Sequence, residues 1–293
     1  MNDFVISTEN TTDLTEKLIG ETGVKVIPMS YYMDGVNYDN VTTTLPVQEF
    51  YARMRNKSMP TTSMINPDQA YLFMEQFVKE GKDVLHLAFS SALSGTYESF
   101  KFAAKKLEEA YPGRKVRVVD SKAASMGEGL FVWHVAKKRA EGATFEETEA
   151  YAQSIVQNVC HYFTVDDLHH LHRGGRVSKA TAILGTILKI KPVLHVDEQG
   201  RLINIGKVRG RKASLAWLVE KMKSKLCELE NPVVFISHGD CIDDAEYVRA
   251  LVQEATGIKR FEMNHIGPII GTHSGPGTVA LFFLGKNRTE AGE

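Results

Sequence analysis

The first half of the sequence alternates short runs of β-branched residues with segments of helical periodicity. The runs cover residues 4–7, 24–32, 84–89 and 116–119. Strands separated by helices pair in parallel, because a parallel connection needs a long crossover. This alternation predicts a parallel sheet covered by helices.

The clearest helix signal follows the second run. Asn66 can cap a helix, Pro67 suits the first helical position, and Gln69 can complete a capping box. We expect a helix over residues 67–80.

From about residue 162 the pattern changes to longer alternating strands with tight turns. We expect strands at 192–196, 202–208, 233–237, 261–266 and 279–284, and helices near 213–229 and 243–255. The segment Asp197-Glu198-Gln199-Gly200 is typical of a hairpin turn. We place a domain boundary within 150–160, which gives an N-terminal domain of residues 1–158 and a C-terminal domain of residues 159–293. A cleft between two domains is the default place for a ligand.

Composition excludes several functional classes. With 43% hydrophobic residues and a net charge of -1, the chain is neither disordered nor broadly basic, so we expect no nucleic-acid partner. The N-terminus lacks the pattern of a signal peptide, and no apolar run is long enough to span a membrane. We therefore expect a cytoplasmic protein. The three cysteines lack metal-ligand spacing and are interpreted as ordinary thiols.

Small hydroxyl residues and glycines gather in three segments that we expect at the carboxyl edge of the parallel sheet. The segments are 61–63, 90–97 and 120–121. Open α/β sheets bind ligands at this edge, and a helix N-terminus there suits a small anion. Serine and threonine before a helix are also ordinary caps, so each segment has a purely structural explanation.

Four glycines and two prolines surround His273 in residues 266–277. Such density indicates special backbone dihedrals or a close approach to another group. One interpretation is a tight loop between the last two strands with His273 exposed. The other gives His273 a hydrogen bond or a positive charge directed at an anionic ligand.

Residues 165–178 allow a metal site to be drawn from Asp166, His169 and His172, although the stretch is equally typical of a solvated helix ending at Gly174. We favour the helix and expect no metal.

Residues 173–212 contain ten lysines and arginines but only two acids, whereas the first fifty residues contain eight acids and two lysines. This asymmetry indicates a docking face or a phosphate-recognition patch. A basic solvated surface is the alternative.

Several catalytic motifs are absent from the sequence. It contains no Gly-Lys-Ser/Thr phosphate loop, no Gly-x-Ser-x-Gly elbow, and no Gly-x-Gly-x-x-Gly opening a helix after the first strand. A free-standing enzyme that acts on a small anionic substrate, with Ser94 as nucleophile and His273 as base, remains an alternative. A short polar pocket with these two side chains in contact would favour it.

Six segments together resemble the DegV family. They are 61–63, 90–97, 119–127, 171–178 with His-Arg-Gly-Gly-Arg, 207–211, and 267–277 with Gly-Pro-Ile-Ile-Gly-Thr-His-Ser-Gly-Pro-Gly. They follow one another along nearly the whole chain. The family comprises bacterial fatty-acid-binding proteins, some of which are binding subunits of fatty acid kinase.

This resemblance implies an α/β fold of two domains, an N-terminal α/β/α domain with a four-stranded parallel sheet and a C-terminal α/β domain with a six-stranded mixed sheet. It also implies a long-chain fatty acid as ligand and no cofactor. The acyl tail would occupy an apolar tunnel near the domain interface. The implied carboxylate ligands are Thr62 or Ser63, Ser94 with the Gly95 amide, and His273.

The resemblance further implies that the protein is not itself the enzyme. It would present the fatty acid to the ATP-binding subunit of a kinase, which forms an acyl phosphate. We assign Arg173, Arg176, Arg209 and Arg211 to a basic face that docks this partner. One departure concerns the first loop, where Glu9-Asn10 replaces the family's usual Asp-Ser pair, so a role for this loop in the head-group site is not expected.

Overall fold

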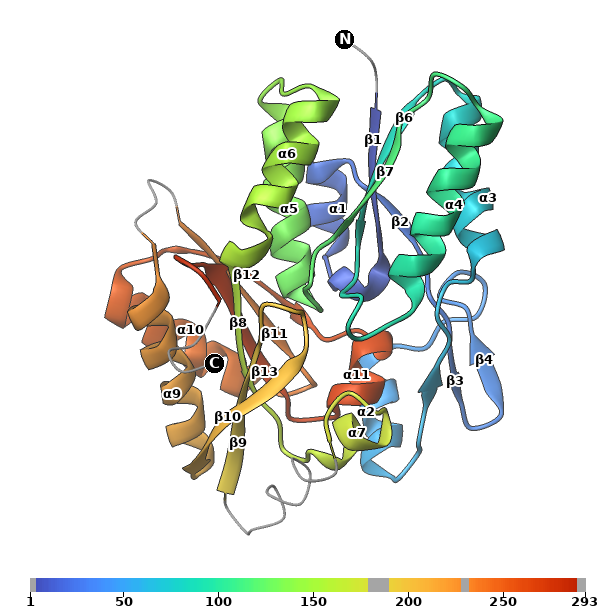
Figure 1. Ribbon diagram of the computed structural model, residues 1–293. Helices are drawn as coiled ribbons and strands as arrows, with labels where there is room; N and C mark the ends of the chain where they lie inside the picture. The colour runs from blue at the N-terminus through green and yellow to red at the C-terminus, as the bar shows by residue number, and fades with distance from the viewer. Residues whose placement is uncertain (1–3, 179–189, 228–231, 289–293) are drawn as a thin grey trace.

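The first sheet is parallel, as the alternation predicts. The computed structural model describes residues 4–178, 190–227 and 232–288, and Figure 1 shows its two sheets with the helices around them. The strand order is β2-β1-β6-β7, with all pairings parallel. These strands are β1 (Phe4–Glu9), β2 (Lys25–Ile27), β6 (Asp83–Ala88) and β7 (Val116–Asp120). The central strands β1 and β6 are buried at every position, because helices cover both faces.

Helices flank this sheet on two sides (Figure 1). One side carries α1 (Glu16–Thr22), α5 (Met126–Ala140) and α6 (Phe145–Ile155), and the other carries α3 (Pro67–Lys79) and α4 (Thr96–Ala110). The capping box at Asn66 and Gln69 is confirmed, and α3 ends one residue before the expected position.

The prediction of a single strand over residues 24–32 is wrong. It is divided at Pro28, which has no N–H to donate to a sheet. Its second part joins a small antiparallel sheet that the sequence did not predict, with the order β4-β3-β5. The members are β3 (Tyr31–Met33), β4 (Val36–Tyr38) and β5 (Thr61–Thr62), and α2 (Val47–Arg55) lies between β4 and β5 in the chain. Thr61 and Thr62 therefore lie in this sheet rather than at the edge of the parallel one.

The second sheet is mixed and has the order β10-β9-β8-β13-β11-β12. Only the β11–β12 pair is parallel. The strands are β8 (Val159–Thr164), β9 (Ile190–Val196), β10 (Leu202–Arg209), β11 (Val233–His238), β12 (Arg260–His265) and β13 (Val279–Leu284). The β9–β10 hairpin around Asp197–Gly200 is confirmed. The sequence reasoning did not delimit β8, although it lies at the centre of the sheet.

Two long helices, α9 (Arg211–Lys225) and α10 (Ile242–Thr256), cover one face of this sheet. Part of the helix expected near 213–229 lies outside the described residues. Two short helices, α7 (His169–Arg173) and α11 (Pro268–Ser274), lie near each other below the first sheet in Figure 1. None of the helices in the described ranges is long and apolar enough to span a membrane.

Helix α5 lies between the two halves of the molecule. It packs against α1 and α6 and also against β8, β11 and β13. Ten of its residues are buried, and one continuous apolar core includes Ile6 and Leu87 of the first sheet with Phe163 and Phe282 of the second. The N-terminal part of α5 is therefore apolar around most of its circumference, and its buried Glu128 carboxylate accepts a hydrogen bond from the Thr8 hydroxyl at 3.2 Å. The division into domains at residue 158 stays a prediction.

Glycine at position 129 allows α5 to approach the first loop. A Cβ there would lie 2.7 Å from the Thr12 carbonyl oxygen and 3.0 Å from Leu14 Cδ2. We predict that Gly129→Ala lowers the free energy of unfolding by about 1–3 kcal/mol, although alanine is the better helix former.

The matched control is Gly20→Ala, which also lies in a helix but meets nothing within 4 Å. It should stabilise the protein by about 0.5–1 kcal/mol. Urea unfolding of both variants measures the difference. Equal effects of the two substitutions would contradict the close packing of α5.

Candidate functional site

A cavity of about 310 Å³ lies between the carboxyl edge of the first sheet and one face of the second. This volume is at the lower end of the range of roughly 300–1,000 Å³ that is usual for small-molecule sites. Its walls are mostly apolar side chains from both halves, namely Met29, Met64, Phe89, Leu93, Ala124, Phe163, Leu171, Val196, Leu202, Ile266, Ile269, Ile270, Ala280 and Phe282. The cavity therefore suits a ligand with a large apolar part.

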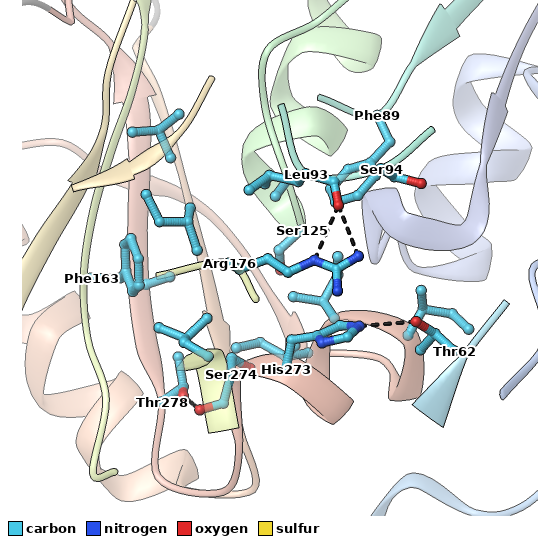
Figure 2. A pocket seen from close by; sticks show the side chains of 18 of the residues that line it. Thr62, Phe89, Leu93, Ser94, Ser125, Phe163, Arg176, His273, Ser274 and Thr278 are labelled. Atoms are coloured by element: carbon cyan, nitrogen blue, oxygen red, sulfur yellow. Dashed lines mark hydrogen bonds between the residues drawn. The ribbon is translucent and has the colours of Figure 1, made fainter. Parts of the chain in front are cut away.

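Polar groups from three separate elements line this cavity (Figure 2). Thr62 comes from β5, Ser94 and Gly95 from the start of α4, and His273 from α11. Thr62 Oγ1 and His273 Nε2 share a hydrogen bond of 2.9 Å. The structure thus brings together four of the five expected carboxylate ligands. The fifth, Ser63, is exposed and does not line the cavity.

Ser94 lies just before helix α4, whose N-cap is Gly95. Its Oγ is 2.9 Å from Thr96 Oγ1 and accepts a hydrogen bond from the Thr96 N–H. The first N–H groups of a helix have no intrahelical acceptor, and the helix dipole favours an anion near them. The start of α4 therefore favours a small anion near Ser94 and Gly95.

Ser94 and His273 do not form the nucleophile and base pair of the alternative enzyme. Within the described part of the chain, the Ser94 hydroxyl bonds to Thr96, whereas the His273 ring bonds to Thr62. The surrounding cavity is mostly apolar rather than short and polar. Both observations weaken the alternative of a free-standing enzyme that acts on a small anionic substrate.

His273 lies on helix α11. The interpretation of residues 266–277 as a tight loop with His273 exposed is therefore wrong. Gly267 caps the helix and Pro268 occupies its first turn. Burial, together with the nearby charges of Arg176 and Arg173, lowers the pKa of His273 to about 4. The ring is therefore neutral near pH 7 and offers a hydrogen bond rather than a positive charge.

Arg176 was expected on the docking face, but its side chain lines the cavity (Figure 2). Its Nε and Nη2 donate to the Leu93 carbonyl oxygen at 3.1 and 2.9 Å. Leu93 immediately precedes Ser94, so this arginine fixes the loop that leads into α4. Its guanidinium also places a positive charge in the cavity wall. Arg173, by contrast, is exposed.

Arg211 was also expected on the docking face, but its side chain makes internal contacts. Its Nε donates to Asp244 at 2.8 Å and its Nη2 donates to the Gly277 carbonyl oxygen at 2.6 Å, which holds α9 against α10 and the loop before β13. Arg209, two residues earlier, is exposed. Two lysines of the basic segment, Lys179 and Lys189, lie outside the described residues.

The metal site drawn from Asp166, His169 and His172 does not assemble. Lys191 Nζ lies 2.7 Å from Asp166, and the His169 ring bonds to Asp167 at 2.7 Å. Across the described ranges, no group of three histidine, cysteine or acidic side chains is arranged to hold a metal ion.

The first loop, which contains Glu9 and Asn10, holds two residues of the cavity wall in place. Asn10 Oδ1 accepts a hydrogen bond from the Met29 N–H at 2.9 Å, and the buried Glu9 carboxylate accepts one from the Phe89 N–H at 3.1 Å. Met29 and Phe89 line the cavity, whereas Glu9 and Asn10 do not. The substituted pair therefore positions two wall residues without touching the ligand space.

The sequence reasoning gave no role to Ser125, which also lines the cavity. Its backbone has φ 54° and ψ -148°, a strained conformation for any residue other than glycine. The Ser125 hydroxyl donates to the Asp13 carboxylate, which also accepts a hydrogen bond from the Gly267 N–H at 2.9 Å. Burial raises the pKa of Asp13 to about 7. Segment 119–127 was a signal for this site, but only the fold brings Asp13 to it.

The lowered pKa of His273 makes a prediction about stability. Because its folded-state pKa of about 4 lies below the ordinary 6.5, the unfolded chain binds the proton more tightly between these values. Stability should fall as the pH drops from about 6.5 to 4, by up to about 3 kcal/mol from this residue alone. The variant His273→Gln should lose correspondingly less stability over the same range, as measured by urea unfolding at each pH. Identical pH profiles would contradict the buried, neutral ring.

Comparison with known proteins finds a matching family and similar relatives. Residues 3–286 match the family model described as "Uncharacterised protein, DegV family". A DegV domain-containing protein of Clostridium perfringens is 38% identical over 289 residues, covering 98% of this chain and 99% of that protein.

Two solved structures are also similar. One is described as "Fatty Acid Binding of a DegV family Protein from Thermus thermophilus", with 28% identity, a TM-score of 0.85, and coverage of 97% of this chain and 100% of that one. The other is a fatty acid binding DegV family protein from Streptococcus agalactiae, with 29% identity, a TM-score of 0.86, and coverage of 98% and 100%. The sequence match over almost the whole length and the shared fold lead to one conclusion: the chain belongs to the DegV family.

Proposed function

We propose that this protein binds one long-chain fatty acid and presents its carboxylate to a separate kinase subunit. The observation that carries the proposal is the cavity itself, where mostly apolar walls meet the polar group formed by Thr62, Ser94, Gly95 and His273. Related DegV proteins of known structure are described as fatty acid binding. The division between apolar and polar walls matches the two parts of a fatty acid.

The acyl tail supplies most of the affinity under this proposal. A sixteen-carbon chain buries about fourteen methylenes at about 0.8 kcal/mol each, which gives roughly 11 kcal/mol before the costs of association. The apolar residues of both sheets provide the surface for this burial.

The carboxylate contributes position more than affinity. A buried anion is costly unless hydrogen-bond donors satisfy it. The Thr62 and Ser94 hydroxyls, the Gly95 amide and the neutral His273 ring are such donors, and the Arg176 guanidinium is a nearby positive charge. His273 donates from the ring nitrogen that carries its proton.

The proposal assigns phosphoryl transfer to a partner, in keeping with the lack of a Gly-Lys-Ser/Thr phosphate-binding loop in the sequence. In the proposed reaction a carboxylate oxygen bonds to the transferred phosphoryl group and ADP leaves from the partner. The exposed cations Arg173 and Arg209 remain our candidates for docking that partner. Arg176 and Arg211 are left out of this docking face because each is held by short internal hydrogen bonds, whereas the contact of Arg173 with the Thr272 carbonyl oxygen is longer, at 3.4 Å.

The first test is to denature the purified protein, extract it with organic solvent and identify the lipid by mass spectrometry. We expect a fatty acid in near-stoichiometric amount, because burial of the tail outlasts purification. An extract without lipid, together with no saturable binding of added fatty acid, would refute the binding function.

A second test concerns the head group. Ser94→Ala should weaken fatty-acid binding by about 1.5–3 kcal/mol, the range for a hydrogen bond to a charged group. The matched control is Ser63→Ala, whose side chain is exposed and outside the cavity, and its affinity should equal that of the parent. Calorimetric titration with palmitate measures both. Equal affinity of the Ser94 variant and the parent would limit the role of the Ser94 hydroxyl to its hydrogen bonds with Thr96.

A third test concerns the kinase. Arg209→Glu should leave palmitate affinity within a few-fold but slow phosphorylation by the partner. The defect should resemble that of added salt, because exposed charges are screened beyond about 10 Å at 0.1 M salt.

Its control is Lys101→Glu, which reverses an exposed cation on α4 outside the basic segment. Turnover against ionic strength separates the variants. Lost lipid binding with normal docking of Arg209→Glu would place this arginine at the ligand site instead.

A further inference from the structure

His161 is a polar side chain in the mostly apolar wall of the cavity. It belongs to β8, is 2% exposed and lines the cavity. Among the described residues, neither ring nitrogen has a hydrogen-bond partner of normal geometry, and the contact of the ring with the Val159 backbone falls short of that geometry. Buried polar side chains without partners are rare in native proteins, so this one needs an explanation.

The His161 ring packs against an aromatic ring and a glycine, and Arg288 and His195 lie close enough to affect its pKa. Its ring meets the Phe282 ring edge to face, with centroids 5.4 Å apart. A Cβ at Gly127 of α5 would lie 2.2 Å from His161 Nε2, so the helix can pass the ring only because this residue is glycine. A phenylalanine or leucine would fill the same place without an unpaired nitrogen.

Strand register places His161 away from the head-group ligands. His161 pairs with Phe282, and Phe163 pairs with Ala280, so these four lining residues share one face of the second sheet. Thr278, four residues before Phe282, donates to the Ser274 carbonyl oxygen beside His273. Four strand residues span roughly 13 Å. His161 thus lies in the part of the cavity that the acyl tail occupies.

The ring is neutral in this setting. Burial is the main reason that the pKa of His161 lies well below its usual range, with the charge of Arg288 adding to the effect. A neutral imidazole has one donor and one acceptor nitrogen. A hydroxyl group can pair with either nitrogen, whereas a methylene can pair with neither.

We propose that the preferred ligand is a long-chain fatty acid with a hydroxyl group part-way along its chain, and that His161 binds this hydroxyl. The inference rests on the proposed fatty-acid binding and specifies its substrate class. His161 acts as a specificity residue, since it favours a substituted chain over a plain one.

The test compares stearate with a series of monohydroxylated octadecanoic acids that differ in the position of the hydroxyl. Competition binding gives the ratio of affinities for each pair. We expect wild-type protein to prefer at least one position by about tenfold over stearate, a difference of about 1.4 kcal/mol. His161→Phe should abolish this preference.

Two further variants sharpen the result. His161→Gln keeps a donor and an acceptor and should retain a preference for a hydroxylated chain, which also covers a failure of His161→Phe to fold. Phe102→Leu changes an exposed aromatic residue of α4 outside the cavity and should leave the ratio intact.

The outcomes are distinguishable. Stearate binding without a preference for any hydroxylated chain would overturn the role of His161 and leave the binding function standing, as would a preference that survives in His161→Phe. Failure to bind stearate and every hydroxylated acid would overturn both proposals.

Discussion

The burial of helix α5 between two sheets is the constraint on which the rest of the structure depends. One helix serves two cores at once, because its residues contact both α1 and α6 of the first half and β8, β11 and β13 of the second. The glycines at 127 and 129 allow this close approach. The segment that leads into α5 carries Ala124 and Ser125, which line the cavity. The position of α5 therefore sets where the ligand space lies and how the polar loops of the first sheet face the second sheet.

In the proposed function, the acyl tail provides affinity and the polar groups fix the position of the carboxylate. The apolar faces of β8 and β13 offer a long surface for an acyl chain, whereas β5, α4 and α11 each bring a polar group to the cavity wall. Several contacts fix these groups from outside. Arg176 holds the Leu93 carbonyl, Glu9 holds the Phe89 N–H, and Asp13 holds the N-terminus of α11 through Gly267. Donors held in place in this way lose little freedom when a carboxylate binds, so the binding energy of the tail is not spent on ordering the head-group site.

Local signals predicted much of the fold and part of the site. The alternation of strand and helix patterns predicted the parallel sheet, and the capping box at Asn66 predicted α3. The turn segment Asp197–Gly200 predicted the β9–β10 hairpin. Each of these signals depends on residues that are close in the sequence. The break at Pro28 and the small sheet containing Thr62 were missed, since pairing partners of a short strand are not encoded locally. Helix α11 was not predicted because its segment is rich in glycine, which is typical of loops, although Pro268 is a normal first helical residue. Placement of Arg176, Ser125 and His161 in one cavity depends on tertiary packing, which composition and spacing do not reveal.

The central claim is that one cavity binds both parts of a fatty acid. A crystal structure of the protein with bound palmitate tests it most directly. The account predicts a carboxylate within hydrogen-bond distance of Thr62, Ser94 or the Gly95 amide, and His273, with the tail passing between the two sheets toward Phe163 and Phe282. A fatty acid found elsewhere on the molecule, or one in this cavity with its carboxylate at the Phe282 end, would contradict the account.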